Sequence, residues 1–258
     1  MTFIDTHAHL YAEQFNGERE EMIQRAFDNN VDKIFLPNID EGSVKGMEEL
    51  VRKYPNQCYS MMGVHPCNVQ KDWQIQLETI KKAFKKNHHI AIGEIGMDLY
   101  WDKSLEKEQA LMFEAQIKWA KKEQLPIVIH ARNSFDEIFE IVDQLNDDEL
   151  FGVFHCFTGT EEQAKKIIDY GGFKLGVGGV VTFKNGGLDK VLAKIPLEHL
   201  VLETDAPYLA PAPYRGKTNE SSYIPIIAHK LAAIYTVSVE EIGKTTTNNA
   251  KEVFKLTN

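Results

Sequence analysis

The chain contains little cysteine, and the spacing of what it has excludes the common cysteine-based frameworks. Cys58, Cys67 and Cys156 are odd in number and lack the paired spacing of a zinc ribbon. A disulfide framework would pair its cysteines. We therefore expect three reduced thiols in a reducing compartment, which predicts a cytoplasmic protein.

Biased composition and long hydrophobic runs are also lacking. Hydrophobic residues make up 43% of the chain and charged residues 26%, so neither disorder nor a membrane span is expected. The chain does not open on a basic segment followed by an apolar one, so no secretory signal is expected. Its 258 residues suffice for one large core and contain no linker or internal repeat. We expect a single domain over residues 1–258, without a membrane partner.

Positive charge is scarce as well. The chain has 38 acidic and 29 basic residues, which leaves a net charge of −9. Proteins that track a nucleic-acid backbone are usually basic, so a long duplex-binding groove is not expected. This balance still permits an enzyme that holds only one or two phosphates at the end of a strand.

What the chain does contain is a recurring pattern, in which five short apolar runs each lead into a histidine or a carboxylate. The polar residues at these ends are His7, His9, Glu94, His130, His155 and Asp205. A buried parallel strand has such a short apolar run, and a barrel of parallel strands gathers the residues at their C-terminal ends on one face. We therefore predict that these six residues form one metal site.

His7 and His9 are the most specific part of this pattern. Side chains two residues apart on a strand point the same way, so both imidazoles can bind one ion. Imidazoles and carboxylates suit zinc or manganese, and carboxylates also accept magnesium. One His-x-His pair arises easily by chance, whereas six unrelated polar residues at five strand ends would require the same accident five times.

The apolar runs alternate with amphipathic helical patterns. Strands are expected near residues 3–4, 33–36, 59–64, 90–94, 126–130, 150–155, 173–177 and 200–205. Helices are expected over residues 18–29, 43–53, 74–86, 104–122, 134–145, 161–170, 188–194 and 221–235. Eight strands each followed by a helix predict an α/β fold of the closed (β/α)8 TIM barrel type. The competing fold, an open doubly wound sheet, would not bring five of these strand ends around one centre.

Three further residues carry reactive groups but are expected to lie outside the site. Cys156 follows His155, and if that strand continues, the thiol points away from the metal. His88 and His89 follow the lysine-rich segment 81–86, which is most simply a solvated helix end. We expect none of these three side chains to take part in the chemistry.

Six motifs give the chain a family resemblance. They are Asp5-Thr6-His7-Ala8-His9, Gly63-Val64-His65-Pro66, Gly93-Glu94-Ile95-Gly96-Met97-Asp98, His130-Ala131-Arg132, His155-Cys156-Phe157-Thr158-Gly159 and Glu203-Thr204-Asp205-Ala206-Pro207-Tyr208-Leu209. In this order the motifs resemble the TatD family of metal-dependent deoxyribonucleases over nearly the whole chain. The resemblance implies a barrel of the metallo-dependent hydrolase type. It also implies hydrolysis of DNA phosphodiesters, as a 3′ to 5′ exonuclease on single-stranded ends.

The resemblance also assigns roles to the six residues. It divides them between two divalent ions, with His7, His9 and Asp205 on one, His130 and His155 on the other, and Glu94 bridging both. Two such ions hold a shared water and stabilise both oxygens of an in-line displacement. Asp205 would accept the proton of that water, so Asp205 and Glu94 are the expected catalytic residues. If Glu94 only supports a ligand, a single-ion site remains.

Two residues near the metal ligands are expected to contact substrate. His65 ends the third strand run and resembles a family residue that faces the substrate pocket; a structural strand-end histidine is the alternative. Arg132 lies two residues beyond His130, where its planar fork can meet a phosphate. A surface ion pair is the alternative for Arg132.

The loop over residues 206–219 supplies the other expected substrate contacts, Tyr208, Arg215 and Lys217. Prolines restrict this loop, an aromatic ring can stack a base, and the cations can hold phosphate. A stiff surface connection is the alternative. The Arg-Gly-Lys-Thr-Asn-Glu segment 215–220 runs into two serines where the family often has a proline, which leaves the shape of the loop open.

Rival functions would use the same metals. An amidohydrolase, or a deacylase acting on aminoacyl-tRNA, would cleave a C–N bond or an ester in place of a phosphodiester. A non-catalytic binding or scaffold protein would be expected to have lost a ligand, and none is lost. The sequence leaves the metal, the natural substrate and the oligomeric state open.

Overall fold

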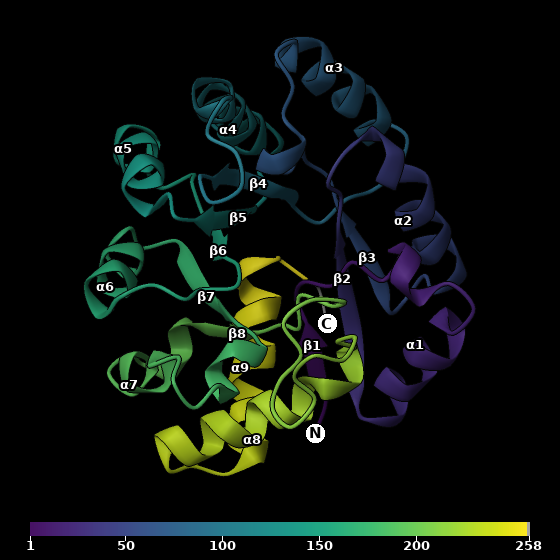
Figure 1. The fold of residues 1–258 in the computed structure, drawn as a ribbon, viewed down its shortest axis with the longest axis vertical. Helices are drawn as coiled ribbons and strands as arrows, with labels where there is room; N and C mark the ends of the chain where they lie inside the picture. Colours follow the sequence, from purple (N-terminus) through teal and green to yellow (C-terminus); the bar gives the residue numbers. More distant parts are fainter. Residues whose placement is uncertain (257–258) are drawn as a thin grey trace.

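The computed structural model describes residues 1–256 and places eight parallel strands at the centre, with helices around them (Figure 1). The strands are β1 (Phe3–Asp5), β2 (Val31–Pro37), β3 (Cys58–Met61), β4 (Ile92–Asp98), β5 (Ile127–Arg132), β6 (Gly152–Phe154), β7 (Phe173–Val177) and β8 (Leu200–Leu202). The helices are α1 (Arg19–Asp28), α2 (Glu41–Lys53), α3 (Trp73–Phe84), α4 (Glu106–Glu123), α5 (Phe135–Leu145), α6 (Glu161–Asp169), α7 (Leu188–Leu192), α8 (Ile224–Tyr235) and α9 (Val239–Val253). The predicted alternation of strand and helix is confirmed.

The strands close into a barrel along two seams. Backbone hydrogen bonds join β1, β2 and β3 into one parallel sheet, and β4 through β8 into another. A bridge from Met61 to Ala91 joins β3 to the start of β4. At the other seam Ala8 bridges to Ala206, and the Thr6 amide donates to the Leu202 carbonyl at 3.0 Å. The closed barrel is thus confirmed over the open sheet.

Alternation along the strands separates two apolar layers. In β1, Phe3 belongs to the larger cluster formed with the helices, whereas Ile4 belongs to a smaller cluster. That smaller cluster fills the barrel and includes Ile4, Phe35, Met61, Val128, Val153 and Val201. Phe254, which follows α9, packs on Phe35 with ring centroids 4.7 Å apart. Helix α9 therefore closes the N-terminal end of the barrel, and the polar residues occupy the other end.

The sequence pattern does not predict α9. Its residues include three Thr and two Asn, which are weak helix formers, but Ser238 caps it by accepting from the Glu241 amide. Within residues 1–256 no single helix is long and apolar enough to cross a membrane. Two consecutive helical segments, Ser221–Tyr235 and Val239–Val253, are together long and apolar enough by length and composition alone. They are bent by 108° relative to each other.

The predicted strand ends are partly wrong. Strands β4 and β5 run past Glu94 and His130, to Asp98 and Arg132, so neither polar residue ends its strand. Strand β1 ends before His7, and β6 ends before His155. The predicted ligands therefore lie at different positions relative to the ends of their strands.

His89 also differs from expectation, because it is buried rather than solvated. Its side chain follows α3, stacks on Phe84 with centroids 5.1 Å apart, and has Nδ1 2.8 Å from the Ser60 hydroxyl. Burial lowers the pKa of His89 from 6.5 to about 4. The neighbouring His88 is exposed, as expected.

Candidate metal centre

Glu94 lies at the centre of the site, and each of its two carboxylate oxygens faces a different group of imidazoles. Oε2 is 3.1 Å from Nε2 of His7 and 3.5 Å from Nε2 of His9. Asp205 completes this first group, with Oδ1 3.5 Å from Nε2 of His9 and 3.9 Å from Nε2 of His7. Glu94 is 2% exposed, so these contacts lie away from bulk water.

The second oxygen of Glu94, Oε1, faces three imidazoles. It is 2.9 Å from Nδ1 of His130, 3.1 Å from Nε2 of His155 and 3.4 Å from Nε2 of His65. The ring of His155 stacks on that of His7 with centroids 3.7 Å apart, so the two groups touch. The structure therefore gathers the other five predicted ligands around the carboxylate of Glu94, and adds His65.

A hydrogen bond behind the ring of His9 determines which of its nitrogens carries the hydrogen. Tyr11 donates its hydroxyl hydrogen to the carbonyl of Pro37 at 2.6 Å. Its oxygen must then accept from Nδ1–H of His9, which is 2.9 Å away. His9 therefore presents the lone pair of Nε2 to Glu94 and Asp205, as a metal ligand must.

Buried carboxylates lie behind the rings of both His130 and His155. Oδ2 of Asp98 is 2.9 Å from Nε2 of His130, and Oε1 of Glu203 is 3.3 Å from Nδ1 of His155. An ionised carboxylate only accepts, so His130 donates from Nε2 to Asp98 and turns Nδ1 towards Glu94, whereas Nδ1 of His155 lies at ion-pair distance from Glu203 without a hydrogen bond. Nδ1 of His130 and the Glu94 oxygen are both acceptors. Only a proton or a metal cation between them satisfies both.

His65 is oriented in the opposite sense. Its Nδ1 accepts from the backbone amide of Cys67 at 3.1 Å. Burial lowers the pKa of His65, and a neutral ring with an acceptor at Nδ1 carries its hydrogen on Nε2, which faces Glu94. We therefore infer that His65 is a hydrogen-bond donor to Glu94 and not a metal ligand.

The electrostatics of the site suit a cation. Burial alone would raise the pKa of Glu94, but His65, His155 and His7 outweigh it and hold that pKa well below the usual range. Burial, reinforced by His155, lowers the pKa of His7, which favours a neutral ring. Burial would also raise the pKa of Asp205, but the neighbouring imidazoles of His9, His155 and His7 outweigh it and lower that pKa. Imidazole nitrogens and carboxylate oxygens are the donor set of zinc and manganese sites, and magnesium accepts the carboxylates.

Two buried carboxylates outside the ligand set hold the surrounding backbone. Asp5 accepts from the amide of Thr204 at 2.9 Å and from its hydroxyl at 2.6 Å, which ties the end of β1 to the end of β8. Burial raises the pKa of Asp5 to about 7. Glu203 accepts from the Cys156 amide, and a Cβ on Gly176 would lie 2.3 Å from Oε2 of Glu203. Glycine at 176 therefore leaves the room that this carboxylate occupies.

The sequence pattern indicates no role for Tyr11, Asp98 or Glu203, although each contacts a candidate ligand. A signal existed for two of them. Asp98 lies four residues after Glu94 in β4, so both side chains are on the same face of the strand, and Glu203 lies two residues before Asp205. Tyr11 depends on the carbonyl of Pro37, a contact between distant segments that no local pattern indicates.

Five of the six predicted ligands line a cavity of about 1140 Å³ at the mouth of the barrel, and His7 lies buried behind them. His65, Arg132 and Tyr208 line the same cavity, as the sequence predicts for substrate contacts. Cys156 also lines it, which corrects the expectation that its thiol points away. Strand β6 ends at Phe154, and Cys156 has φ 47°, so the chain turns where the prediction assumed a continuing strand. Burial raises the pKa of the Cys156 thiol well above its usual range, which disfavours a thiolate.

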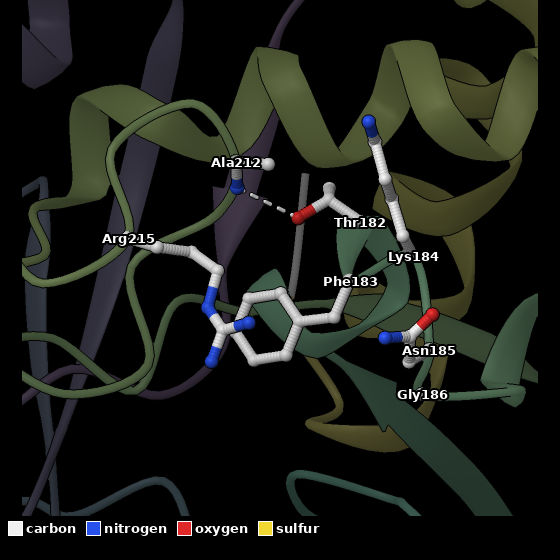
Figure 2. Close-up of a pocket in the computed structure, with 7 residues that line it drawn as sticks. All are labelled: Thr182, Phe183, Lys184, Asn185, Gly186, Ala212 and Arg215. Carbon is white, nitrogen blue, oxygen red and sulfur yellow. Dashed lines mark hydrogen bonds between the residues drawn. The ribbon is translucent and has the colours of Figure 1, made fainter.

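Arg215 and Lys217 do not line this cavity, although the sequence predicts both as substrate contacts. Figure 2 shows Arg215 over the ring of Phe183, 4.0 Å from its centroid, in a separate cavity of about 560 Å³. The hydroxyl of Thr182 accepts from the Ala212 amide at 2.8 Å and joins the two loops that form this cavity. Lys217 lines neither cavity; its Nζ lies 5.6 Å from the ring of Tyr214.

Comparison with known proteins agrees with this geometry. A family model described as TatD related DNase matches residues 4–255. The metal-dependent hydrolase YabD of Bacillus subtilis is 38% identical over 253 residues, which cover 98% of each chain. The 3′-5′ ssDNA/RNA exonuclease TatD of a Pantoea species is 29% identical over 259 residues, which cover 98% of this chain and 99% of the relative. The crystal structure of YjjV, a TatD homologue from Escherichia coli K12, has a TM-score of 0.92 at 30% identity and covers 99% of this chain and 98% of that one.

Proposed function

Because the chain belongs to the family of TatD-related DNases and is a metal-dependent hydrolase, we propose that it cleaves phosphodiester bonds in DNA. We propose 3′ to 5′ exonuclease action on single-stranded ends. The name of the Pantoea relative supports this substrate, since that protein is a 3′-5′ exonuclease of single-stranded DNA and RNA. The YabD relative supports the hydrolase class alone.

The observation that carries the proposal is the position of Glu94 between two groups of imidazoles. We propose that one divalent ion binds His7, His9 and Asp205, that a second binds His130 and His155, and that Glu94 bridges them. Bound divalent ions supply acidification of a water molecule and charge stabilisation for an in-line displacement at phosphorus. Zinc, manganese and magnesium all accept this donor set.

Asp205 is the proposed general base. Its Oδ1 faces His9, and its side chain lines the cavity with 14% exposure, so the carboxylate lies where a water molecule in the cavity can reach it. The lowered pKa of Asp205 keeps the carboxylate ionised and able to accept a proton. Glu94 is held in place by the ring of His65, whose Nε2 faces it at 3.4 Å.

The charges around the cavity favour a strand end over a duplex. Among the described residues that line the 1140 Å³ cavity, Arg132 is the only lysine or arginine. One guanidinium can hold one phosphate through its planar fork, but it cannot follow a backbone over several nucleotides. A third cavity of about 890 Å³ shares Arg132 with the metal cavity and Gly186 with the Arg215 cavity. We propose that the rest of a single strand follows this succession of cavities.

A substrate panel tests the proposal. The metal-loaded protein would be incubated with a 5′-labelled single-stranded oligonucleotide, the matching blunt duplex, an aminoacyl-tRNA ester and an N-acyl amide. We expect products shortened stepwise from the 3′ end of the single strand, and slower cleavage of the duplex. Hydrolysis of the ester or amide with none of the oligonucleotide would contradict the proposal and select the deacylase or amidohydrolase alternative.

An Asp205→Asn variant tests the assigned base in the same assay. We expect turnover of the oligonucleotide to fall by about 10²-fold or more, the scale of general-base catalysis, while binding of single-stranded DNA changes little. Asp148→Asn, which changes an exposed aspartate, is the matched control and should behave as the wild type. A turnover rate that survives Asp205→Asn with the metals in place would rule out this base.

A further inference from the structure

Two aromatic rings lie exposed beside the metal cavity, on the loop between β4 and α4. Tyr100 is 53% exposed and Trp101 is 69% exposed. The rings meet edge to face, with centroids 4.9 Å apart and planes at 87°. Trp101 lines the metal cavity, and Tyr100 lines the adjoining 890 Å³ cavity. Neighbouring exposed rings at the mouth of a site are a mark of ligand binding, because water contact with both faces is unfavourable.

Arg132 joins the two rings into one surface. Its guanidinium carbon lies 4.0 Å from the centroid of Tyr100 and 5.1 Å from that of Trp101. Within residues 1–256, Arg132 has no carboxylate at ion-pair distance, so its charge is left for a ligand. The three side chains, called here the aromatic platform, thus combine flat apolar faces with one uncompensated cation.

Asp98 connects this platform to the metal centre. Its Oδ1 accepts from the amides of Tyr100 at 3.0 Å and Trp101 at 3.3 Å. Its Oδ2 is 2.9 Å from Nε2 of His130, a candidate metal ligand. Asp98 is buried, so the loop backbone is held at a defined position relative to His130 and Glu94.

We propose that the aromatic platform stacks the base of the terminal nucleotide whose phosphodiester is cleaved. This inference rests on the proposed nuclease function and names the part of the substrate that is recognised. Every base has a π face, so stacking accepts all four and reads no sequence. Arg132, whose guanidinium lies over the ring of Tyr100, carries the charge that a phosphate of the same nucleotide requires and leaves the ring of Trp101 as the more open face. The platform therefore recognises that a base is present and not which base it is.

A pair of oligonucleotides tests the platform. One carries a normal 3′-terminal nucleotide, and the other has an abasic residue there with the same phosphates. For the wild type we expect kcat/KM to be roughly tenfold higher with the base, within the range measured for one base stacked on an aromatic ring. Trp101→Ala should bring the ratio between the two substrates close to one, and Trp101→Phe should keep most of it.

The matched control is Ile75→Ala, which removes another exposed apolar side chain, on α3 and away from the site. It should keep the wild-type ratio. An unchanged ratio in Trp101→Ala would overturn the platform, and so would an equal loss with both substrates, because that pattern indicates only a structural role.

Binding measurements separate failure of this inference from failure of the proposed function. The chain has three tryptophans, and Trp101 is the exposed one among the described residues. Quenching of its fluorescence by the two oligonucleotides, with Trp101→Phe as the blank, requires no cleavage. If the wild type cleaves neither oligonucleotide, the nuclease proposal fails. Tighter binding of the base-containing strand would then still support the platform, and equal binding of the two strands would overturn it.

Discussion

Oε1 of Glu203 lies 3.3 Å from Nδ1 of His155, at a fully buried position beneath the candidate metal centre. Nε2 on the other side of the same ring lies 3.1 Å from Oε1 of Glu94. The carboxylate of Glu203 accepts from the Cys156 amide, so it also holds the backbone that follows the ligand. Glu203 is thus a positioning residue that acts through His155.

Removing the charge of Glu203 should therefore weaken metal binding. Glu203→Gln should lower the affinity for divalent metal by about 10-fold or more, because loss of a carboxylate behind a ligating histidine typically costs 10- to 100-fold. Titration of the metal-free protein measures this affinity, and saturating metal should restore much of the activity. Glu198→Gln, which alters an exposed glutamate before β8, is the control. Equal metal affinity in the two variants would argue against the positioning role.

The sequence predicts which residues lie together at the site because each follows an apolar run. His7, His130 and His155 are recognisable without any structure, since parallel strands converge only in a closed barrel or at one edge of a sheet. The sequence does not predict how far along its strand each of these residues lies. Strand β4 stays buried and continues to Asp98, and no local pattern shows that it runs past Glu94. The orientation of each ring is also beyond the sequence, since it depends on partners from distant segments.

Proximity in the chain is a weaker guide to the substrate contacts. Tyr208 and Arg215 belong to the same loop after β8, yet Tyr208 lines the metal cavity and Arg215 lies over Phe183 in another one. The path of the loop depends on its contact with Thr182 from the β7 to α7 connection. Helix α9 escapes prediction for a related reason, because packing on the barrel stabilises a segment of low helix propensity.

The cavity beneath Arg215 gives a prediction that separates it from Lys217. Arg215 and Lys184 both line that cavity, and neither has an ion-pair partner within residues 1–256. Arg215→Gln should raise KM for a long single-stranded oligonucleotide and flatten the dependence of KM on salt, while turnover changes little. Lys217→Gln should have a smaller effect, because Lys217 lies on Tyr214 outside both cavities. Steady-state kinetics at two salt concentrations compare them, and equal effects would refute this distinction.

Buried His89 should make the protein less stable in acid. Burial lowers the pKa of His89 to about 4 in the folded state, from 6.5 in the unfolded chain. Between these values the unfolded chain binds the proton more tightly, so the contribution of His89 to stability is complete above pH 6.5. It is lost as the pH falls towards 4, by up to about 1.4 kcal/mol per pH unit.

Urea unfolding between pH 4.5 and 7.5 measures this effect. The difference in the free energy of unfolding between the wild type and His89→Gln should change with pH, in favour of the variant at the acid end. His88→Gln, at an exposed position, should run parallel to the wild type. A difference between the wild type and His89→Gln that is constant over this range would show that His89 does not titrate as proposed.

Counting the metal ions bound per chain, with the rate of DNA hydrolysis measured on the same samples, tests the central claim most directly. Since Glu94 presents one oxygen to each imidazole group, we predict two divalent ions per chain in the wild type and at most one in Glu94→Gln. Turnover of single-stranded DNA in Glu94→Gln should fall by about 10²-fold or more, the scale of a misplaced reactive group. Glu149→Gln, an exposed control, should keep both ions and the rate. Full activity with a single ion in the wild type, or two ions and an unchanged rate in Glu94→Gln, would contradict the account.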